Sequence, residues 1–167
     1  MTQQTLNDIN DMSREIFIGT LGKIYEHSPW VAERSLTSRP FSSLDDLHET
    51  MKKTVQSANK KEKLTLLRAH PDLAGRVELT TSSQKEQSGA GLDQLSQEEY
   101  ENFLALNRRY TEKFNFPFIM AVKGHSKDSI YHSMMERVEN DYDREYETAL
   151  NEIYKIARFR LEDAIKP

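Results

Sequence analysis

Two short polar stretches hold the residues best suited to chemistry. His70 opens the stretch HPDLAGR at residues 70–76, and Ser83, Glu86 and Gln87 follow a few residues later. An imidazole gives or takes a proton more readily than other side chains near neutral pH. A carboxylate and an amide close to it would hold a small polar substrate through hydrogen bonds. The spacing therefore predicts acid–base chemistry at a turn-rich bend between helices, where a rigid scaffold fixes exposed groups.

Both stretches also have a purely structural interpretation. Pro71 and Gly75 could simply end a helix, with His70 capping its last carbonyl groups. Ser83 and Glu86 stand three residues apart and could form a capping box. The SGAG sequence that follows would end such a helix almost at once, so little helix would be gained. A very short helix with a serine, a glutamate and a glutamine at its N-terminal end would instead bind anionic and amide groups of a ligand.

The remaining histidines are weaker candidates. His27, His48 and His132 fit structural or solvent-facing positions, while His125 could belong to a site or to a cap. His132 and Glu136 are four residues apart, but no second histidine stands at metal-site spacing. We therefore expect no catalytic metal. Phosphate-binding glycine loops, a nucleophile elbow and a dinucleotide fingerprint do not occur in the sequence.

Composition narrows the class of protein. The chain has 167 residues, which suits one domain over residues 1–167, and 37% of them are apolar. The net charge is −4 and no sustained basic face exists, so nucleic acid is not the expected partner. Cysteine is absent, which excludes disulfides and thiolate chemistry. With no secretory signal and no apolar run of ~20 residues, we expect a cytoplasmic protein without a membrane span.

The positioning elements are predicted to be helices. Apolar residues recur at intervals of three and four, and strict alternation is absent, so we expect an all-α domain of about seven or eight helices. One helix should cover Lys60–Ala69 and stop near His70, since a residue before proline disfavours the α region. Expected helix starts are Ser28, Ser43, Ser96, Ser126 and Asn140. An N-terminal apolar stripe comprises Ile9, Met12, Ile16, Phe17, Leu21 and Ile24.

Three separated motifs resemble those of one enzyme family. They are HPDLAG at residues 70–75, S-x-x-E-Q-x-x-A-G-L at residues 83–92, and FPFI at residues 116–119, where an apolar run to Val122 breaks the helical spacing. Together with EHSPWVAE at residues 26–33, they are similar to 2-oxo-4-hydroxy-4-carboxy-5-ureidoimidazoline (OHCU) decarboxylases of the urate-to-allantoin pathway. The likeness runs over nearly the whole chain.

This resemblance implies specific roles. It makes His70 and Glu86 the catalytic pair and implies an all-α homodimer, in some bacteria fused to urate oxidase. The implied substrate contacts are Pro71, Ser83, Gln84, Lys85, Glu86, Gln87, Phe118, Ile119, Met120, Ala121 and Val122. His70 would handle a proton, Glu86 would accept hydrogen bonds, and residues 118–122 would supply backbone groups and an apolar wall.

The implied reaction needs no cofactor. The substrate carries its carboxylate beside an imine-like carbon, so electrons released with carbon dioxide flow into the substrate itself. The protein would orient the carboxylate, stabilise the intermediate and protonate one face. Two other functions fit the helical pattern: a non-enzymatic binding module, and a lyase or hydrolase acting on a related ureide.

Overall fold

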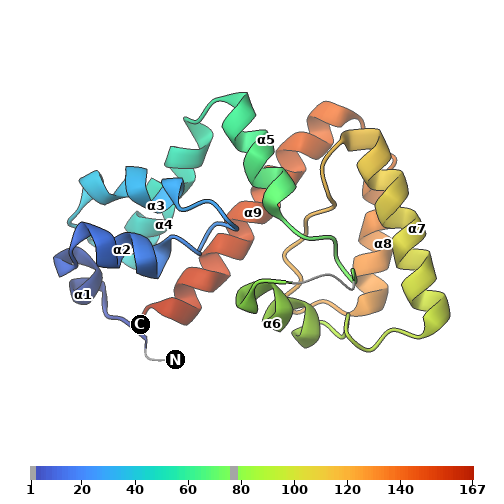
Figure 1. The fold of residues 1–167 in the computed structure, drawn as a ribbon, viewed down its shortest axis with the longest axis horizontal. Helices are drawn as coiled ribbons and strands as arrows, with labels where there is room; N and C mark the ends of the chain where they lie inside the picture. The colour runs from blue at the N-terminus through green and yellow to red at the C-terminus, as the bar shows by residue number, and fades with distance from the viewer. Residues whose placement is uncertain (1–2, 76–78) are drawn as a thin grey trace. The chain divides into compact units, whose positions relative to one another are not determined.

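Helices make up the regular structure of the chain. The computed structural model describes residues 3–75 and 79–167. Its helices are α1 (Leu6–Asp11), α2 (Arg14–Leu21), α3 (Trp30–Ser35), the 3-10 helix η1 (Leu36–Ser38), α4 (Leu44–Gln56), α5 (Lys60–Ala69), α6 (Thr81–Gly89), α7 (Gln97–Phe114), α8 (Lys127–Arg137) and α9 (Tyr142–Ala164) (Figure 1). In these ranges the one strand-like pairing is a bridge between Gln4 and Ile165. The predicted all-α fold is confirmed.

The chain divides into two units. The first comprises Met1–Ala69 and Tyr154–Pro167, and the second comprises His70–Ile153, so that α9 contributes to both. The single domain over residues 1–167 stays a prediction. Every residue predicted to form the site belongs to the second unit. Over the described ranges, no helix combines the length and the apolar character that crossing a membrane requires.

The N-terminal apolar stripe does not form one helix, because Ile9 lies in α1, Ile16, Phe17 and Leu21 lie in α2, and Met12 and Ile24 lie outside both helices. Thr5 caps α1 and Ser13 caps α2, each through a side-chain oxygen that accepts a backbone N–H three residues later. Ile9 and Phe17 are buried, whereas Ile16 is 57% exposed. The prediction that Ile16 shares the inward face is therefore wrong, because the break before Ser13 changes the helical phase.

Most predicted helix starts are confirmed. Side-chain caps form at Ser43 of α4, Ser96 of α7 and Ser126 of α8. Two others are wrong by one residue. Pro29 occupies the N-cap of α3, and the Ser28 hydroxyl instead donates to the carbonyl oxygen of Glu26. At α9, the side chain of Asp141 rather than Asn140 accepts a first-turn N–H.

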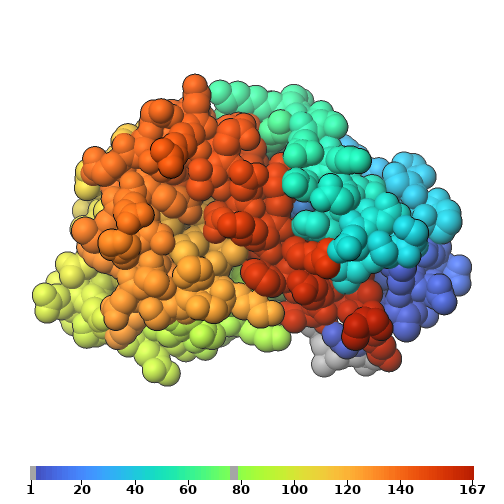
Figure 2. Space-filling view, turned by 180° about the vertical axis from the view of Figure 1, so that it is seen from behind, coloured from blue at the N-terminus to red at the C-terminus, as the bar shows by residue number. Residues whose placement is uncertain are grey.

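The core of the second unit is rich in aromatic rings. α7 and α8 lie side by side (Figure 1), and the surfaces of α8 and the start of α9 adjoin on the face seen in Figure 2. Tyr110, Phe114, Phe116 and Phe118 pack with ring centroids 4.6–6.0 Å apart. Asn115 ends α7 in the left-handed conformation, at φ 63°. The chain then runs irregularly to Ser126, so the predicted break at residues 116–122 is confirmed.

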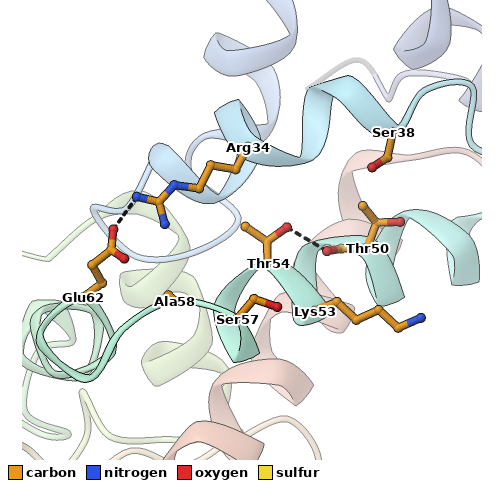
Figure 3. Close-up of a pocket in the computed structure, with 8 residues that line it drawn as sticks. All are labelled: Arg34, Ser38, Thr50, Lys53, Thr54, Ser57, Ala58 and Glu62. Atoms are coloured by element: carbon orange, nitrogen blue, oxygen red, sulfur yellow. Dashed lines mark hydrogen bonds and ion pairs between the residues drawn. The ribbon is translucent and has the colours of Figure 1, made fainter.

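A polar hollow lies on the first unit. It has a volume of about 460 Å³ (Figure 3). Its lining residues are Arg34, Ser38, Thr50, Lys53, Thr54, Ser57, Ala58 and Glu62. Arg34 is paired with Glu62, and the Thr54 hydroxyl donates to the Thr50 carbonyl oxygen. None of the predicted site residues is part of this lining.

Candidate active site

The bend begins where α5 ends. The helix covers Lys60–Ala69 as predicted, and His70 follows it directly at 8% exposure. Pro71 explains the ending, since the residue before a proline is pushed out of the α region. Leu73 and Ala74 turn the chain and are buried, and Ala74 has φ 65°. A non-glycine residue in this conformation persists when its surroundings hold it there.

Two buried amide side chains hold the bend. The Ala74 N–H donates to Oε1 of Gln87 at 2.9 Å, and Nδ2 of Asn107 donates to the Leu73 carbonyl oxygen at 2.8 Å. Nε2 of Gln87 also lies 3.4 Å from the carbonyl oxygen of Asp72. Gln87 and Asn107 are 6% and 3% exposed. Helices α6 and α7 therefore set the course of the backbone that follows His70.

Helix α6 starts earlier than the capping-box interpretation requires. Its N-cap is Thr80, whose hydroxyl accepts the Ser83 N–H at 3.2 Å. Ser83 therefore lies inside the first turn, and its interpretation as a cap paired with Glu86 is wrong. Ser83 and Gln87 are buried, Glu86 is half-buried, and Gln84 and Lys85 are exposed. Glu86 is consequently not needed to start the helix.

A cavity of about 320 Å³ opens beside the bend and α6. Its lining residues are Ala74, Gly75, Leu79, Gln84, Gln87, Ser88, Leu92, Asp93, Leu95 and Tyr100. Of the predicted substrate contacts, Gln84 and Gln87 contribute to it. Desolvation raises the pKa of the nearby Asp72 carboxyl, although that residue is exposed, so water limits the energetic effect.

The apolar segment 118–122 is buried throughout. The exposed fractions of its five residues lie between 1% and 8%. The Ile119 carbonyl oxygen accepts from Nη1 of Arg137 at 2.7 Å, and the Ala121 N–H donates to Oε1 of Glu152 at 3.1 Å. The Val122 carbonyl oxygen accepts from the His125 N–H at 2.9 Å. Side chains of α8 and α9 thus fix the backbone at Ile119 and Ala121, and a backbone hydrogen bond fixes it at Val122.

A buried carboxylate stands behind this segment. Glu145 is fully buried, and its Oε1 accepts from the Tyr110 hydroxyl at 2.7 Å and from Nε of Arg137 at 2.6 Å. Its Oε2 accepts from Nδ2 of Asn140 at 3.0 Å. Burial first, and then the bond to Glu145, raise the pKa of the Tyr110 phenol well above its usual range. Tyr110 is therefore a neutral donor to the carboxylate.

Helix α7 supports both irregular stretches. Asn107 holds the bend, and Tyr110, one helical turn later, packs against Phe118 with the ring planes at 88°. Residues three apart lie on one helix face. In the sequence, Asn107 stands at helical spacing from the apolar residues Phe103 and Tyr110. A polar residue among buried apolar ones was the available signal, because such a group needs a hydrogen-bond partner.

Other supporting residues gave no local signal. Arg137, Glu145 and Glu152 are ordinary charged residues of helices in the sequence, and only the fold turns them toward residues 118–122. The described residues include no group of three or more histidine or acidic side chains placed to hold a metal ion.

Comparison with known proteins decides the family. The model of the OHCU decarboxylase family matches residues 10–162. The chain belongs to the OHCU decarboxylase family. An OHCU decarboxylase of Halalkalicoccus jeotgali is 48% identical over 167 residues, which is 100% of this chain and 95% of the relative. The uric acid degradation bifunctional protein PucL of Bacillus subtilis is 47% identical over 96% of this chain but 33% of its own length.

A solved structure gives the same result. The crystal structure of an OHCU decarboxylase in the presence of (S)-allantoin superposes with a TM-score of 0.73 and 25% sequence identity, covering 91% of this chain and 97% of that chain. The predicted family and enzyme class are confirmed: this OHCU decarboxylase family member is a carboxy-lyase. The roles of individual site residues stay predictions.

Proposed function

We propose that this chain decarboxylates 2-oxo-4-hydroxy-4-carboxy-5-ureidoimidazoline to (S)-allantoin in urate breakdown. The family match over residues 10–162 carries the proposal. The similar OHCU decarboxylase was crystallised in the presence of (S)-allantoin, which supports the handedness of the product. The buried His70 at a braced bend supplies a group suited to proton transfer.

The chemistry follows from the substrate. The bond between the ring carbon and its carboxylate breaks, carbon dioxide leaves, and the electron pair moves into the adjacent carbon–nitrogen double bond. The nitrogen takes up a proton and a second proton adds to one face of the former imine carbon, while the hydroxyl group loses its proton and becomes a carbonyl at the carbon that carried the carboxylate. His70 handles the proton that adds to carbon or the hydroxyl proton, and Glu86 accepts hydrogen bonds from ring N–H or hydroxyl groups. No cofactor is required, because the substrate is its own electron sink.

The remaining predicted contacts orient the substrate. Pro71 borders the imidazole, and residues 83–87 present hydroxyl, amide and carboxylate groups from α6. Oε1 of Gln87 accepts from the Ala74 N–H and Nε2 donates to the Asp72 carbonyl oxygen, so we assign substrate binding there to the second N–H of the amide nitrogen. Residues 118–122 supply an apolar wall beside their backbone groups. Holding the reacting groups in one geometry accounts for much of an enzyme's rate advantage.

Assembly and location are part of the proposal. We propose a homodimer, as the family resemblance implies, and a cytoplasmic location. The bifunctional relative of Bacillus subtilis is about three times as long as the matched part, since that part is 33% of its length. A domain of this kind is therefore compatible with fusion to another domain of uric acid degradation.

The test uses substrate made in place from urate. Circular dichroism should show allantoin of one hand forming faster with this protein than with a heat-denatured sample. Spontaneous decarboxylation lets a proton reach both faces and gives a racemate. A product that forms at the uncatalysed rate and without optical activity would overturn the proposal. Faster turnover of another ureide in a substrate panel would replace the proposed substrate with that ureide.

A further inference from the structure

The guanidinium of Arg137 makes contacts in three directions at once. Its Nε and Nη2 lie 2.6 Å and 2.5 Å from Oε1 of Glu145. Its Nη1 donates to the carbonyl oxygen of Ile119 at 2.7 Å. The face of the group lies 4.3 Å from the centroid of the Phe118 ring. A planar group with five donors can make these contacts together, whereas a lysine ammonium is a single point of charge.

Glu145 and Tyr110 complete a closed set of contacts. Tyr110 packs edge-on against Phe118 at 5.4 Å between ring centroids, and its hydroxyl donates to the same Glu145 oxygen that Arg137 binds. Phe118 is therefore held from two sides by groups that share one carboxylate. We name Tyr110, Arg137 and Glu145 the charged clamp.

Burying the charged clamp in the protein interior costs desolvation free energy. Glu145 is fully buried and the Arg137 side chain is 13% exposed. Two charges removed from water lose hydration that their attraction only partly replaces, and well-packed apolar residues would often be as stable. Apolar residues could not, however, fix the direction of the Ile119 carbonyl group. The physical effect specific to this pair is the orientation of the segment's backbone.

We propose that Arg137 and Glu145 are positioning residues that orient the backbone of residues 118–122 toward the substrate. This inference rests on the proposed function. Glu152, bound to the Ala121 N–H, fixes the same segment two residues further along. An error of about 1 Å in such a segment can cost about 100-fold in rate.

The decisive variant is Arg137→Lys, which keeps the charge but loses the planar fork. We expect kcat/KM to fall by about 10- to 100-fold, with a raised KM, because substrate meets a displaced backbone. We also expect faster amide hydrogen exchange in a peptide covering residues 116–122. If Arg137 had a merely structural role, the substitution would lower the amount of folded enzyme and leave the KM of the folded fraction unchanged.

Two controls separate positioning from stability. Leu47→Ala truncates a fully buried side chain in the first unit, so it should lower Tm without changing KM or exchange at residues 116–122. Tyr25→Phe is matched to Tyr110→Phe. Both rings are almost fully buried, but the Tyr25 hydroxyl has no hydrogen-bond partner among the described residues, whereas the Tyr110 hydroxyl binds Glu145. Only Tyr110→Phe should raise KM.

The outcomes decide the two proposals separately. Parental KM and unchanged exchange in Arg137→Lys would overturn the positioning role, even if its Tm falls. If the parent protein gives no turnover, the proposed function fails and exchange alone decides the role of the charged clamp. In that case, the inference would be overturned if residues 116–122 of the Arg137→Lys variant exchange amide hydrogens at the rate of the parent.

Discussion

The bend after His70 and the apolar segment 118–122 are both irregular, yet different chemistry holds them. Neutral amides of Gln87 and Asn107 hold the bend, through one donor and one acceptor. A buried ion pair holds the apolar segment through Arg137. The bend therefore depends on hydrogen-bond geometry, whereas the segment also depends on a balance of charge.

The roles that we propose for the two regions account for this difference. The bend carries His70, for which we propose proton transfer, and a formal charge placed behind the bend would bias the proton affinity of this imidazole. The amides of Gln87 and Asn107 fix its backbone without adding a further charged group to a bend that already carries the Asp72 carboxyl. The apolar segment has no titratable side chain among residues 118–122, so a charged pair behind it disturbs no proton transfer. Four predictions probe this comparison.

The largest effect should come from His70, the residue of the bend that we propose to transfer a proton. We expect His70→Asn to lower turnover by about 10²–10⁴-fold, the usual contribution of an acid–base group. Asparagine retains polarity, so Tm should stay near that of the parent. Turnover is measured on freshly generated substrate and Tm on the same sample. Turnover within a few-fold of the parent would remove the proton-transfer role from the bend.

Breaking the charge balance should cost the most stability. We expect Glu145→Leu to lower the free energy of unfolding by about 3–5 kcal/mol, because it leaves Arg137 buried without its partner. Adding Arg137→Met should restore much of that loss, since an uncharged pair has no such penalty. Urea unfolding of the single and double variants measures both. A double variant less stable than Glu145→Leu would contradict the charge argument.

Substitution of Glu86 tests whether this side chain of α6 contributes to catalysis or only to the stability of the helix. Thr80 already caps this helix, so Glu86→Gln should change Tm by only a few degrees. We expect turnover to fall by about 100-fold, because a charged acceptor forms stronger hydrogen bonds than an amide and one lost in a dry site costs a few kcal/mol. Turnover near that of the parent would leave Glu86 without a catalytic role and His70 without its proposed partner.

Local signals in the sequence predicted helices better than their exact ends. Ser43, Ser96 and Ser126 act as caps because the turn that follows each one supplies the N–H group nearby. Asn140 is not a cap: Asp141 takes that position, and the Asn140 amide binds Glu145. By residue type, Asn140 and Asp141 could each cap α9. The contact between Asn140 and Glu145 leaves the capping position to Asp141.

The bend of the candidate site was predictable because its motif is contiguous, whereas the contacts that depend on the fold were not predictable. The HPDLAG stretch located the bend, because proline after His70 is a local constraint. The extra α6 turn before Ser83 was missed, since Thr80 and Ser83 are equally good caps by residue type. Arg137 reaches Ile119 across eighteen residues of chain. Such pairs have no fixed sequence spacing, so a single sequence cannot reveal them.

The smallest effect should come from the neutral side of the comparison. Asn107→Leu fills a similar volume but removes the donor to the Leu73 carbonyl oxygen. That oxygen would be left buried without its partner, at a cost of about 1–3 kcal/mol. Oδ1 of Asn107 has no partner among the described residues, so its removal costs nothing comparable. Urea unfolding should therefore show a smaller loss for Asn107→Leu than for Glu145→Leu.

The loss of unfolding free energy caused by Asn107→Leu should be the same with and without the Arg137→Met substitution. The reason is that the two side chains hold different stretches of backbone. Equal losses for Asn107→Leu and Glu145→Leu would mean that an amide and an ion pair hold their segments equally strongly. Coupling between Asn107→Leu and Arg137→Met would show that α7 transmits strain between the bend and the apolar segment. The bend and the apolar segment would then be one coupled structural unit. The stability of each could not be assigned to its own amides or its own ion pair.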